Sequence, residues 1–284
     1  MFFMKNFYSQ SQGRCFGTFK LIGEDLLNSF KSAFDVGYRF FDTAQLYDNE
    51  ADLGQAIKKL GISRSEIFII TKVHPNHYFK DLFIPSVHES LKKLDTDYVD
   101  LLLLHWPAKS RDNSDSLAFL QEAHEQGLAS HIGLSNYNIA MIKDAIKKLS
   151  IMPVTNQVEF HPLLDQSRLL SFANSVNLNL SSYCSVARGK IFEFEELNIL
   201  AKKYNCTTAQ ISLSWALQKG VAINTMSSKY ENIKNNYNIL DINISNEDMN
   251  SIDTLSKKIN YRIVTKELFI EQENPMIDCV PEWD

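Results

Sequence analysis

The feature of this chain that most constrains its fold is an alternation of short apolar runs with amphipathic helical patterns, repeating about every 30 residues. Such alternation is typical of parallel strands joined by crossover helices. Eight runs are expected to form strands, the first being the weakest: 14–19, 38–43, 67–72, 99–105, 130–135, 154–159, 178–183 and 221–226. Eight such units close into a barrel, so the sequence predicts the α/β class and a single (β/α)8 TIM barrel with its active site at the C-terminal mouth.

The segments between these runs carry helix start and stop signals. Thr207 with Gln210, and Ser245 with Asp248, have the spacing of capping boxes at helix starts. Gly61 follows an apolar helical face and is expected to end that helix in a left-handed conformation. Helices are therefore predicted from their ends as well as from their periodicity.

The chain is expected to form one domain over residues 1–284, because no repeat, low-complexity tract or linker interrupts the alternation. From about residue 260 to residue 284 the pattern dissolves into Glu, Pro, Ile and aromatic residues. This stretch predicts an irregular C-terminal tail. Its apolar residues indicate that the tail packs against the rest of the protein.

Composition excludes several functional classes. A formal net charge of -5 and dispersed basic residues argue against a nucleic-acid surface. No stretch approaches the roughly 20 apolar residues that span a bilayer, and the first apolar run is too short for a signal peptide. The 4 cysteines lack Cys-x-x-Cys spacing, which indicates free thiols rather than a zinc site or a disulfide framework. We therefore expect a cytoplasmic protein with no membrane partner.

Three of the apolar runs end on ionisable side chains. Asp42, Lys72 and His105 each close a run, and Tyr47 lies one loop after Asp42. Taken singly, these residues have ordinary structural explanations: a turn or cap for Asp42, an exposed strand end for Lys72 and a hydrogen-bonded core histidine for His105. A charge at the end of a buried strand is costly unless it is paired, so three together favour a shared polar site.

Residues that end different strands of a barrel meet at one mouth. In chain order the predicted strands end at Gly17 and Thr18, Asp42, Lys72, His105, Ser135 and Asn136, Gln157, Tyr183 and Ser227. The first half of the barrel supplies ionisable groups for proton chemistry. The second half supplies amides, hydroxyls and an aromatic ring, which can hold a flat heterocycle bearing a carboxamide, such as nicotinamide.

Four residues and two motifs together resemble the aldo-keto reductase superfamily, over nearly the whole chain: Asp42, Tyr47, Lys72 and His105, with Gly-Leu-Ser-Asn at 133–136 and Asn-Gln-Val-Glu at 156–159. Within it, segment 42–51 and the ending at 281–284 are most similar to the bacterial 2,5-diketo-D-gluconate reductase B group. The resemblance implies reduction of small aldehydes, ketones or keto-sugars, including 2,5-diketo-D-gluconate and methylglyoxal. It also implies a monomer.

The resemblance further implies a nicotinamide cofactor, NADPH with NADH as an option, extended across the mouth. Its expected ligands are Gly17, Thr18, Ser135, Asn136, Gln157, Tyr183, Ser185, Ser227, Ser228, Lys229, Asn232 and Asn236. Ser135, Asn136 and Gln157 would bind the carboxamide, and Tyr183 would stack on the ring. Residues from Ser227 to Asn236 would hold the adenosine end.

Three positions near the expected cofactor depart from the pattern of this superfamily, and a fourth is His74, where tryptophan is often found. Met226 and Asn232 stand where lysine and arginine are common near the adenosine 2′-phosphate, which separates NADPH from NADH. Ser227, Ser228 and Lys229 remain as phosphate ligands, so NADPH stays the expected cofactor with dual use open. Ser185 stands where proline is frequent in the loop that covers the pyrophosphate, which would make that loop more mobile.

The four residues suggest how a carbonyl is reduced. Tyr47 is the expected general acid, and its pKa of about 10 would have to fall at a cost of about 3 to 4 kcal/mol. A Lys72 ammonium about 4 Å away supplies roughly that much at an effective dielectric near 20. Asp42 would keep this lysine protonated. His105 would either orient the carbonyl or join a relay to Tyr47, and the sequence does not choose between these roles.

The sequence constrains the identity of the substrate least. His74, Trp106 and Trp283 are candidate substrate contacts. His74 and His77 lack the further ligands of a metal site, so no metal is expected. A cofactor-sensing or regulatory protein on the same fold, with little turnover, is the alternative. A metal-dependent hydrolase ranks far behind, because no His-x-His follows the first strand.

Overall fold

The computed structural model describes residues 6–110, 112–272 and 276–283. Eight parallel strands close into a barrel in the order β1 to β8, and β1 pairs with β8. The strands are β1 (Arg14–Gly17), β2 (Phe40–Asp42), β3 (Phe68–Val73), β4 (Val99–Leu104), β5 (Ala129–Ser135), β6 (Thr155–Glu159), β7 (Asn179–Tyr183) and β8 (Val221–Thr225). All eight predicted strands are confirmed, with ends that differ by one or two residues.

The first strand was the weakest in the sequence, yet it completes the barrel. Phe16 pairs with Phe41 of β2 on one side and with Thr225 of β8 on the other. Gly17 lies opposite Asp42, so the end of β1 sits beside the end of β2. The pairing fixes the register of the two strands at the mouth.

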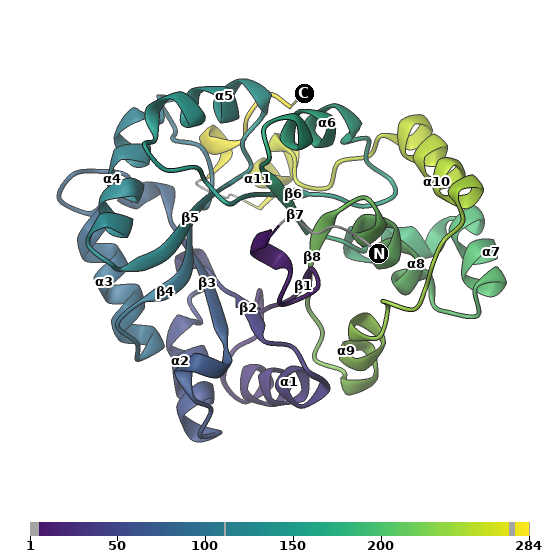
Figure 1. Cartoon of the computed structure of the whole chain (residues 1–284), viewed down its shortest axis with the longest axis horizontal. Coiled ribbons are helices and arrows are strands. Elements are labelled where there is room, and N and C mark those ends of the chain that lie inside the picture. The colour runs from purple at the N-terminus through teal and green to yellow at the C-terminus, as the bar shows by residue number, and fades with distance from the viewer. Residues whose placement is uncertain (1–5, 111, 273–275, 284) are drawn as a thin grey trace.

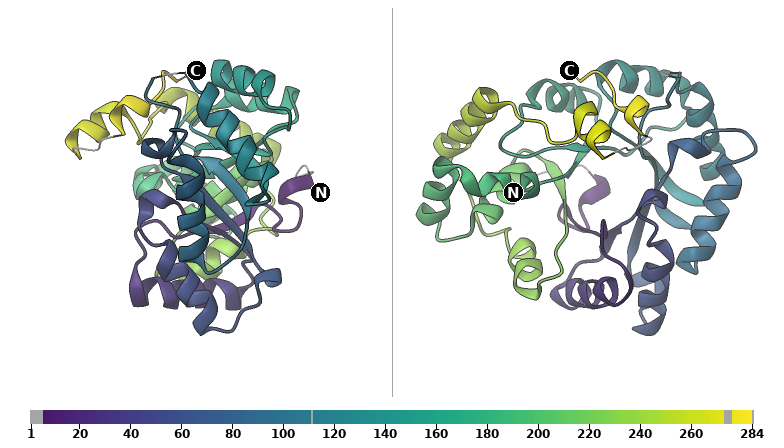
Figure 2. Two further views of the ribbon diagram at one scale, coloured as in Figure 1. Left: turned by 90° about the vertical axis from the view of Figure 1, so that its left-hand side faces the viewer. Right: turned by 180° about the vertical axis from the view of Figure 1, so that it is seen from behind.

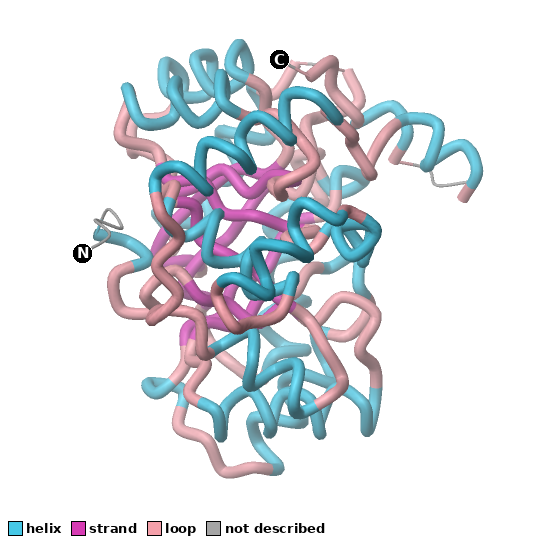
Figure 3. Tube along the Cα trace, turned by 90° about the vertical axis from the view of Figure 1, so that its right-hand side faces the viewer, coloured by secondary structure: helices cyan, strands magenta, loops and turns pink. Residues whose placement is uncertain are grey.

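Helices surround the strands, as the ribbon and tube views show (Figures 1 and 3). They are α1 (Gly23–Val36), α2 (Glu50–Lys59), α3 (Phe83–Leu94), α4 (Ser114–Glu125), α5 (Ile139–Lys148), α6 (Ser167–Ser175), α7 (Glu195–Lys203), α8 (Thr208–Gln218), α9 (Tyr230–Tyr237), α10 (Asn246–Ile259) and α11 (Lys266–Glu271). Each of the longer helices turns an apolar stripe toward the sheet, and the resulting core lies between the helices and the outer face of the strands.

The predicted helix ends are confirmed with one exception. Thr207 and Gln210 form a reciprocal capping box at the start of α8, and Gly61 adopts φ 65° after α2. Ser245 accepts the Asp248 N–H at the start of α10. The reciprocal half of this second box is wrong, because the Ser245 N–H donates to the Tyr204 hydroxyl instead.

The two chain ends cover opposite ends of the barrel (Figure 2). At one end a turn of 3-10 helix, η1 (Asn6–Tyr8), places Tyr8 against Cys15, Ile70 and Leu101 in the barrel interior. At the other end the tail packs on residues that follow the strands. The mouth that carries the polar strand ends is therefore the end that the tail approaches.

The tail, expected to be irregular, contains a short helix, α11, and a turn of 3-10 helix, η6 (Ile277–Cys279). Its apolar side chains form a separate cluster with Trp106, which follows β4. Phe269 of α11 meets the Trp106 ring edge-on at 5.3 Å between centroids. The tail therefore packs on the mouth of the barrel.

Candidate active site

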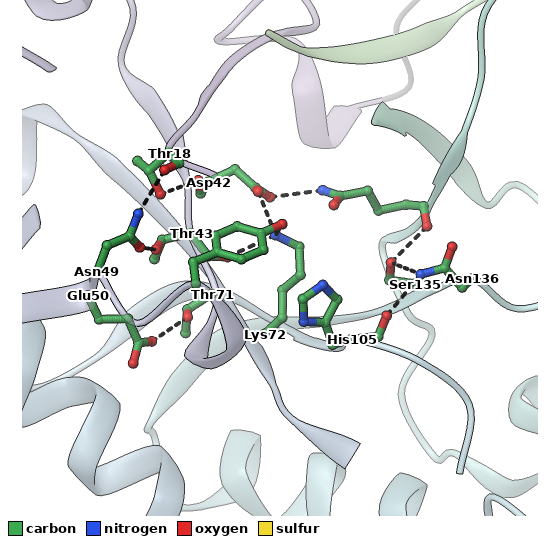
Figure 4. A network of polar contacts seen from close by, with 12 residues as sticks. Thr18, Asp42, Thr43, Asn49, Glu50, Thr71, Lys72, His105, Ser135 and Asn136 are labelled. Carbon is green, nitrogen blue, oxygen red and sulfur yellow. Dashed lines mark hydrogen bonds and ion pairs between the residues drawn. The ribbon is translucent and has the colours of Figure 1, made fainter. Parts of the chain in front are cut away.

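The structure brings Asp42, Lys72 and Tyr47 into one polar cluster at the ends of β2 and β3 (Figure 4). The Lys72 ammonium donates to Asp42 Oδ1 at 2.5 Å, to the Thr43 carbonyl at 2.8 Å and to the Tyr47 hydroxyl at 3.3 Å. Lys72 is fully buried and Asp42 is 3% exposed. Three acceptors thus satisfy the three protons of an ammonium that water does not reach.

The pKa values in this cluster follow from burial and from the ion pair. Burial alone would lower the pKa of Lys72, but the Asp42 carboxylate outweighs it and the net pKa is raised. Burial raises the pKa of Tyr47, and the adjacent Lys72 ammonium offsets this only in part. The predicted fall in the Tyr47 pKa is therefore wrong, because desolvation of the phenol outweighs the charge of Lys72.

His105 lies at the same mouth, beside Tyr47. The two rings meet edge-on at 5.6 Å between centroids. Burial, reinforced by Lys72 and His74, lowers the pKa of His105 well below its usual value, so the imidazole is neutral at neutral pH. Among the described residues its buried Nδ1 has no hydrogen-bond partner. A neutral imidazole can donate through one nitrogen to a carbonyl oxygen.

Asn49 holds the loop that presents Tyr47. This role was not predicted from the sequence. Asn49 is fully buried, and its amide donates to the carbonyls of Thr18 and Leu21 while its oxygen accepts from the Thr43 hydroxyl. Asn49 therefore ties the loops after β1 and β2 together. The sequence did contain a signal for this role, because Asn49 is a polar residue in the loop between Tyr47 and the start of α2.

Gln45 is a second positioning residue that the sequence did not reveal. It begins the turn of 3-10 helix that contains Tyr47, η2 (Gln45–Tyr47). Its Oε1 accepts the N–H of His74 and contacts His77 Nδ1, both at 2.8 Å, and its amide donates to the Ser86 carbonyl. The loops after β2 and β3 are thereby joined.

The three expected carboxamide ligands lie together and are linked to the charged cluster. The Ser135 hydroxyl donates to the Gln157 carbonyl, and the Asn136 amide donates to the His105 carbonyl (Figure 4). Asn136 adopts φ 63°, which an asparagine tolerates better than most residues. The Gln157 amide donates to Asp42 Oδ2 at 2.8 Å. Gln157 thus connects the amide half of the mouth to the ion pair.

Other expected cofactor ligands line the same mouth. Tyr183 donates to the Asn136 side-chain oxygen at 2.6 Å, and Thr18 donates to the Asp42 carbonyl at 3.2 Å. Gly17 ends β1. A Cβ added at this residue would lie 3.7 Å from the Thr225 carbonyl oxygen, which is an ordinary van der Waals distance. Ser185 is 4% exposed, and its hydroxyl lies 2.6 Å from that of Ser182. A hydrogen bond between two hydroxyls therefore holds Ser185 at the end of β7, at the position where proline is frequent.

The residues expected at the adenosine end lie apart from the charged cluster, on the loop after β8 and on α9. Ser228, Lys229 and Asn232 are exposed, and Ser227 and Asn236 are half-buried. Met226 is 43% exposed. Ser227 accepts the Lys229 N–H at 3.1 Å, which shapes the turn that leads into α9. Among the described hydrogen bonds, none joins this group to the ion pair.

The three candidate substrate residues have different environments. Burial, with His77 and Lys109, lowers the pKa of His74 to about 4, so this ring is neutral at neutral pH. Trp106 is 4% exposed and packs under the tail. Trp283 has the Arg262 guanidinium 3.9 Å from its ring centroid. Only His74 and Trp283 keep surface that a ligand could reach.

Comparison with known proteins agrees with this geometry. The model of the Aldo/keto reductase family matches residues 15–257. This chain belongs to that family. Methylglyoxal reductase DkgB of Escherichia coli O157:H7 is 37% identical over 94% of this chain and 97% of its own length. Glyoxal reductase of Bacillus subtilis (strain 168) is 36% identical over 85% of this chain and 87% of its own.

Solved structures of the family share the fold. The crystal structure assigned to a 2,5-diketo-D-gluconic acid reductase B superposes with a TM-score of 0.88 at 37% identity, covering 96% of this chain and 93% of that one. Aldose reductase from Schistosoma japonicum superposes with a TM-score of 0.82 at 28% identity, over 89% and 90% of the two chains. The predicted superfamily and barrel are confirmed, and the protein is an oxidoreductase of a carbonyl-reducing family.

Two kinds of feature are absent from the described residues. No described helix combines the length and the apolar character needed to cross a membrane. Likewise, three or more His, Cys, Asp or Glu side chains do not gather into a metal-binding group anywhere in the described ranges.

Proposed function

We propose that this protein reduces small aldehydes, ketones or keto-sugars with a nicotinamide hydride donor, and that Tyr47 protonates the product oxygen. The observation that carries the proposal is the single ammonium of Lys72, held by Asp42 at 2.5 Å and placed 3.3 Å from the Tyr47 hydroxyl. Carbonyl reduction needs a proton at oxygen as hydride reaches carbon. A donor held beside a fixed cation meets that need.

The raised pKa of Tyr47 is compatible with this role. A general acid must keep its proton until the substrate oxygen becomes alkoxide-like, and a phenol with a raised pKa does so at neutral pH. Lys72 then stabilises the phenolate that the transfer leaves behind, because a cation in a buried site acts at a low effective dielectric. Neutral His105 is suited to donate a hydrogen bond that orients the carbonyl.

The residues at the mouth fit a nicotinamide cofactor. Ser135, Asn136 and Gln157 offer amide and hydroxyl groups that match a carboxamide, and Tyr183 offers a ring beside them. When bound, such a cofactor supplies the hydride. We favour NADPH over NADH because Lys229 is exposed at the start of α9 and can bind a phosphate. Met226 and Asn232 carry no charge, so the expected difference in affinity between the two cofactors is smaller than it would be with lysine and arginine there.

Relatives guide the choice of substrate. The DkgB proteins are named for methylglyoxal and a structural neighbour for 2,5-diketo-D-gluconic acid. Both compounds are small dicarbonyls. We therefore infer that this chain prefers small, polar carbonyl compounds, and a neutral His74 ring near the mouth supports that inference, because it can hydrogen-bond to a substrate oxygen.

The test compares wild type with Tyr47→Phe. Nicotinamide absorbance is followed with methylglyoxal, 2,5-diketo-D-gluconate and an aromatic aldehyde, using NADPH and then NADH, and both cofactor dissociation constants are measured. We expect Tyr47→Phe to lower kcat by at least about 100-fold with little change in cofactor affinity. Near-normal turnover in the variant would remove Tyr47 as the acid. Tight cofactor binding without turnover in wild type would favour the sensor alternative.

A further inference from the structure

One buried carboxylate at the mouth takes no part in the proposed chemistry. Glu159, the last residue of β6, is fully buried. Its Oε1 accepts the Ile263 N–H at 2.6 Å, and its Oε2 accepts the Val264 N–H at 2.8 Å. Its Oε1 also lies 2.9 Å from His161 Nε2. Both carboxylate oxygens are therefore occupied, two of the three contacts coming from the backbone of the tail.

The histidine side of this arrangement is fixed as well. His161 is fully buried, and its Nδ1 accepts the Leu163 N–H at 3.3 Å. The ring proton therefore lies on Nε2, which donates to Glu159. Burial alone would raise the pKa of Glu159, but His161 and the two tail N–H groups outweigh it and lower that pKa. The carboxylate is ionised, and its hydrogen bonds to the tail are charge-assisted.

From this anchor the tail runs along the ends of β4 to β7. Phe269 packs on Trp106, the residue after His105. The Glu282 carbonyl accepts from the Asn138 amide at 2.9 Å, on the loop after β5. Tyr183, at the end of β7, packs on the same apolar cluster as Val264. These are the strand ends that carry His105 and the expected carboxamide ligands.

We propose that Glu159 is a positioning residue that fastens the described part of the tail, residues 260–272 and 276–283, against one side of the carbonyl-substrate pocket. The inference rests on the proposed function, since the role assigned to Glu159 is to shape the pocket of that reaction. Two peptide N–H groups point at one ionised carboxylate, and the chain they fasten continues onto Trp106 beside His105. Displacing the tail therefore changes the surface that a substrate meets at His105.

The first variant is Glu159→Gln, which keeps the size of the side chain. A glutamine amide has one acceptor oxygen and an NH2 group, so at least one of the three donors would face another donor. We expect KM for methylglyoxal to rise about tenfold, kcat to change less, and the cofactor dissociation constant to stay within about twofold. Trypsin should cleave after Lys266, an exposed residue of α11, several-fold faster than in wild type.

Asp248→Asn is the matched control, because it alters another buried carboxylate. Asp248 lies in the first turn of α10 and not at the end of a strand. Asp248 is 7% exposed and accepts from Lys203, Tyr204 and the Ser245 hydroxyl. This variant should lower the melting temperature without changing KM or the cleavage rate at Lys266. A rise in KM equal to that of Glu159→Gln would mean that general destabilisation explains both.

Asn138→Asp provides a second variant that does not disturb a buried charge. Asn138 caps α5 by accepting the Met141 N–H, while its amide holds the Glu282 carbonyl. Aspartate keeps the capping oxygen and removes only the donor to the tail. We expect KM and cleavage at Lys266 to rise here too, by smaller factors. If Glu159→Gln fails to fold, this variant decides the question.

The two readouts separate the inference from the proposed function. Wild type that turns over no carbonyl compound would contradict the function, while cleavage at Lys266 would still report whether Glu159 fastens the tail. Unchanged cleavage and unchanged KM in both variants would overturn the inference. Faster cleavage with unchanged KM would also overturn it, since the tail would then be fastened without shaping the pocket.

Discussion

At the scale of single residues, the ion pair between Asp42 and Lys72 is the most demanding feature of the molecule. Both groups are withdrawn from water, and each is tolerated because the other is present. Gln157 adds a hydrogen bond to the second oxygen of Asp42. A buried pair of this kind is weak evidence for stability, because the cost of desolvating both groups offsets much of their attraction.

Removing the cation alone should therefore be costly. We expect Lys72→Met to lower the free energy of unfolding by about 3 to 5 kcal/mol, because it leaves Asp42 buried and unpaired. The double variant Asp42→Asn/Lys72→Met should regain most of that stability while turnover stays lost. Denaturant unfolding with a fixed m-value measures both changes. Full activity in the double variant would show that the cation is dispensable.

At the scale of elements, side-chain amides bridge the loops that follow the strands. Asn49 joins the loops after β1 and β2, and Gln45 joins those after β2 and β3. Tyr47 lies between these two amides in the chain. The phenol is thus placed by side chains that touch neither cofactor nor substrate in the proposed reaction.

We expect Asn49→Ala to lower the free energy of unfolding by about 2 to 4 kcal/mol, because two carbonyls and one hydroxyl lose their buried partner. Turnover should fall by at least about tenfold, since Tyr47 is no longer held. Thr207→Ala, which removes the cap of α8 away from the mouth, should cost about 1 kcal/mol and leave kcat unchanged. An Asn49→Ala enzyme with wild-type kcat would contradict the positioning role.

Element boundaries were predictable where their causes are local. All eight strands and the Thr207 box follow from nearby residues, and they are confirmed. The reciprocal half of the Ser245 box failed because Tyr204, from the neighbouring helix, takes its place. The helix α11 spans only 6 residues, too few to show a periodic pattern. Local signals thus fail where a distant group competes or where an element is short.

At the scale of the whole molecule, the contacts that organise the mouth join residues far apart in sequence. Gln157 meets Asp42 across 115 positions, and Glu159 meets Val264 across 105. The sequence indicated that these polar residues end strands and so share a mouth. It gave no means of telling which oxygen each donor would reach, because that depends on strand register and on the path of the tail.

The balance of buried titratable groups also determines how the whole protein responds to acid. The pKa of His105 is lowered in the folded state, so between pH 6.5 and that lower value the unfolded chain binds one more proton at this site than the folded chain does. Stability contributed by His105 is therefore present above pH 6.5 and is lost as the pH falls. The slope for one proton is about 1.4 kcal/mol per pH unit.

We expect wild type to lose stability relative to His105→Gln as the pH falls below 6.5, with a slope that approaches but does not exceed about 1.4 kcal/mol per pH unit. Because both proteins share every carboxylate, their difference isolates the histidine. Parallel pH profiles for wild type and His105→Gln would mean that the imidazole takes up a proton in the folded state as readily as in the unfolded chain. The neutral donor assigned to His105 would then be lost.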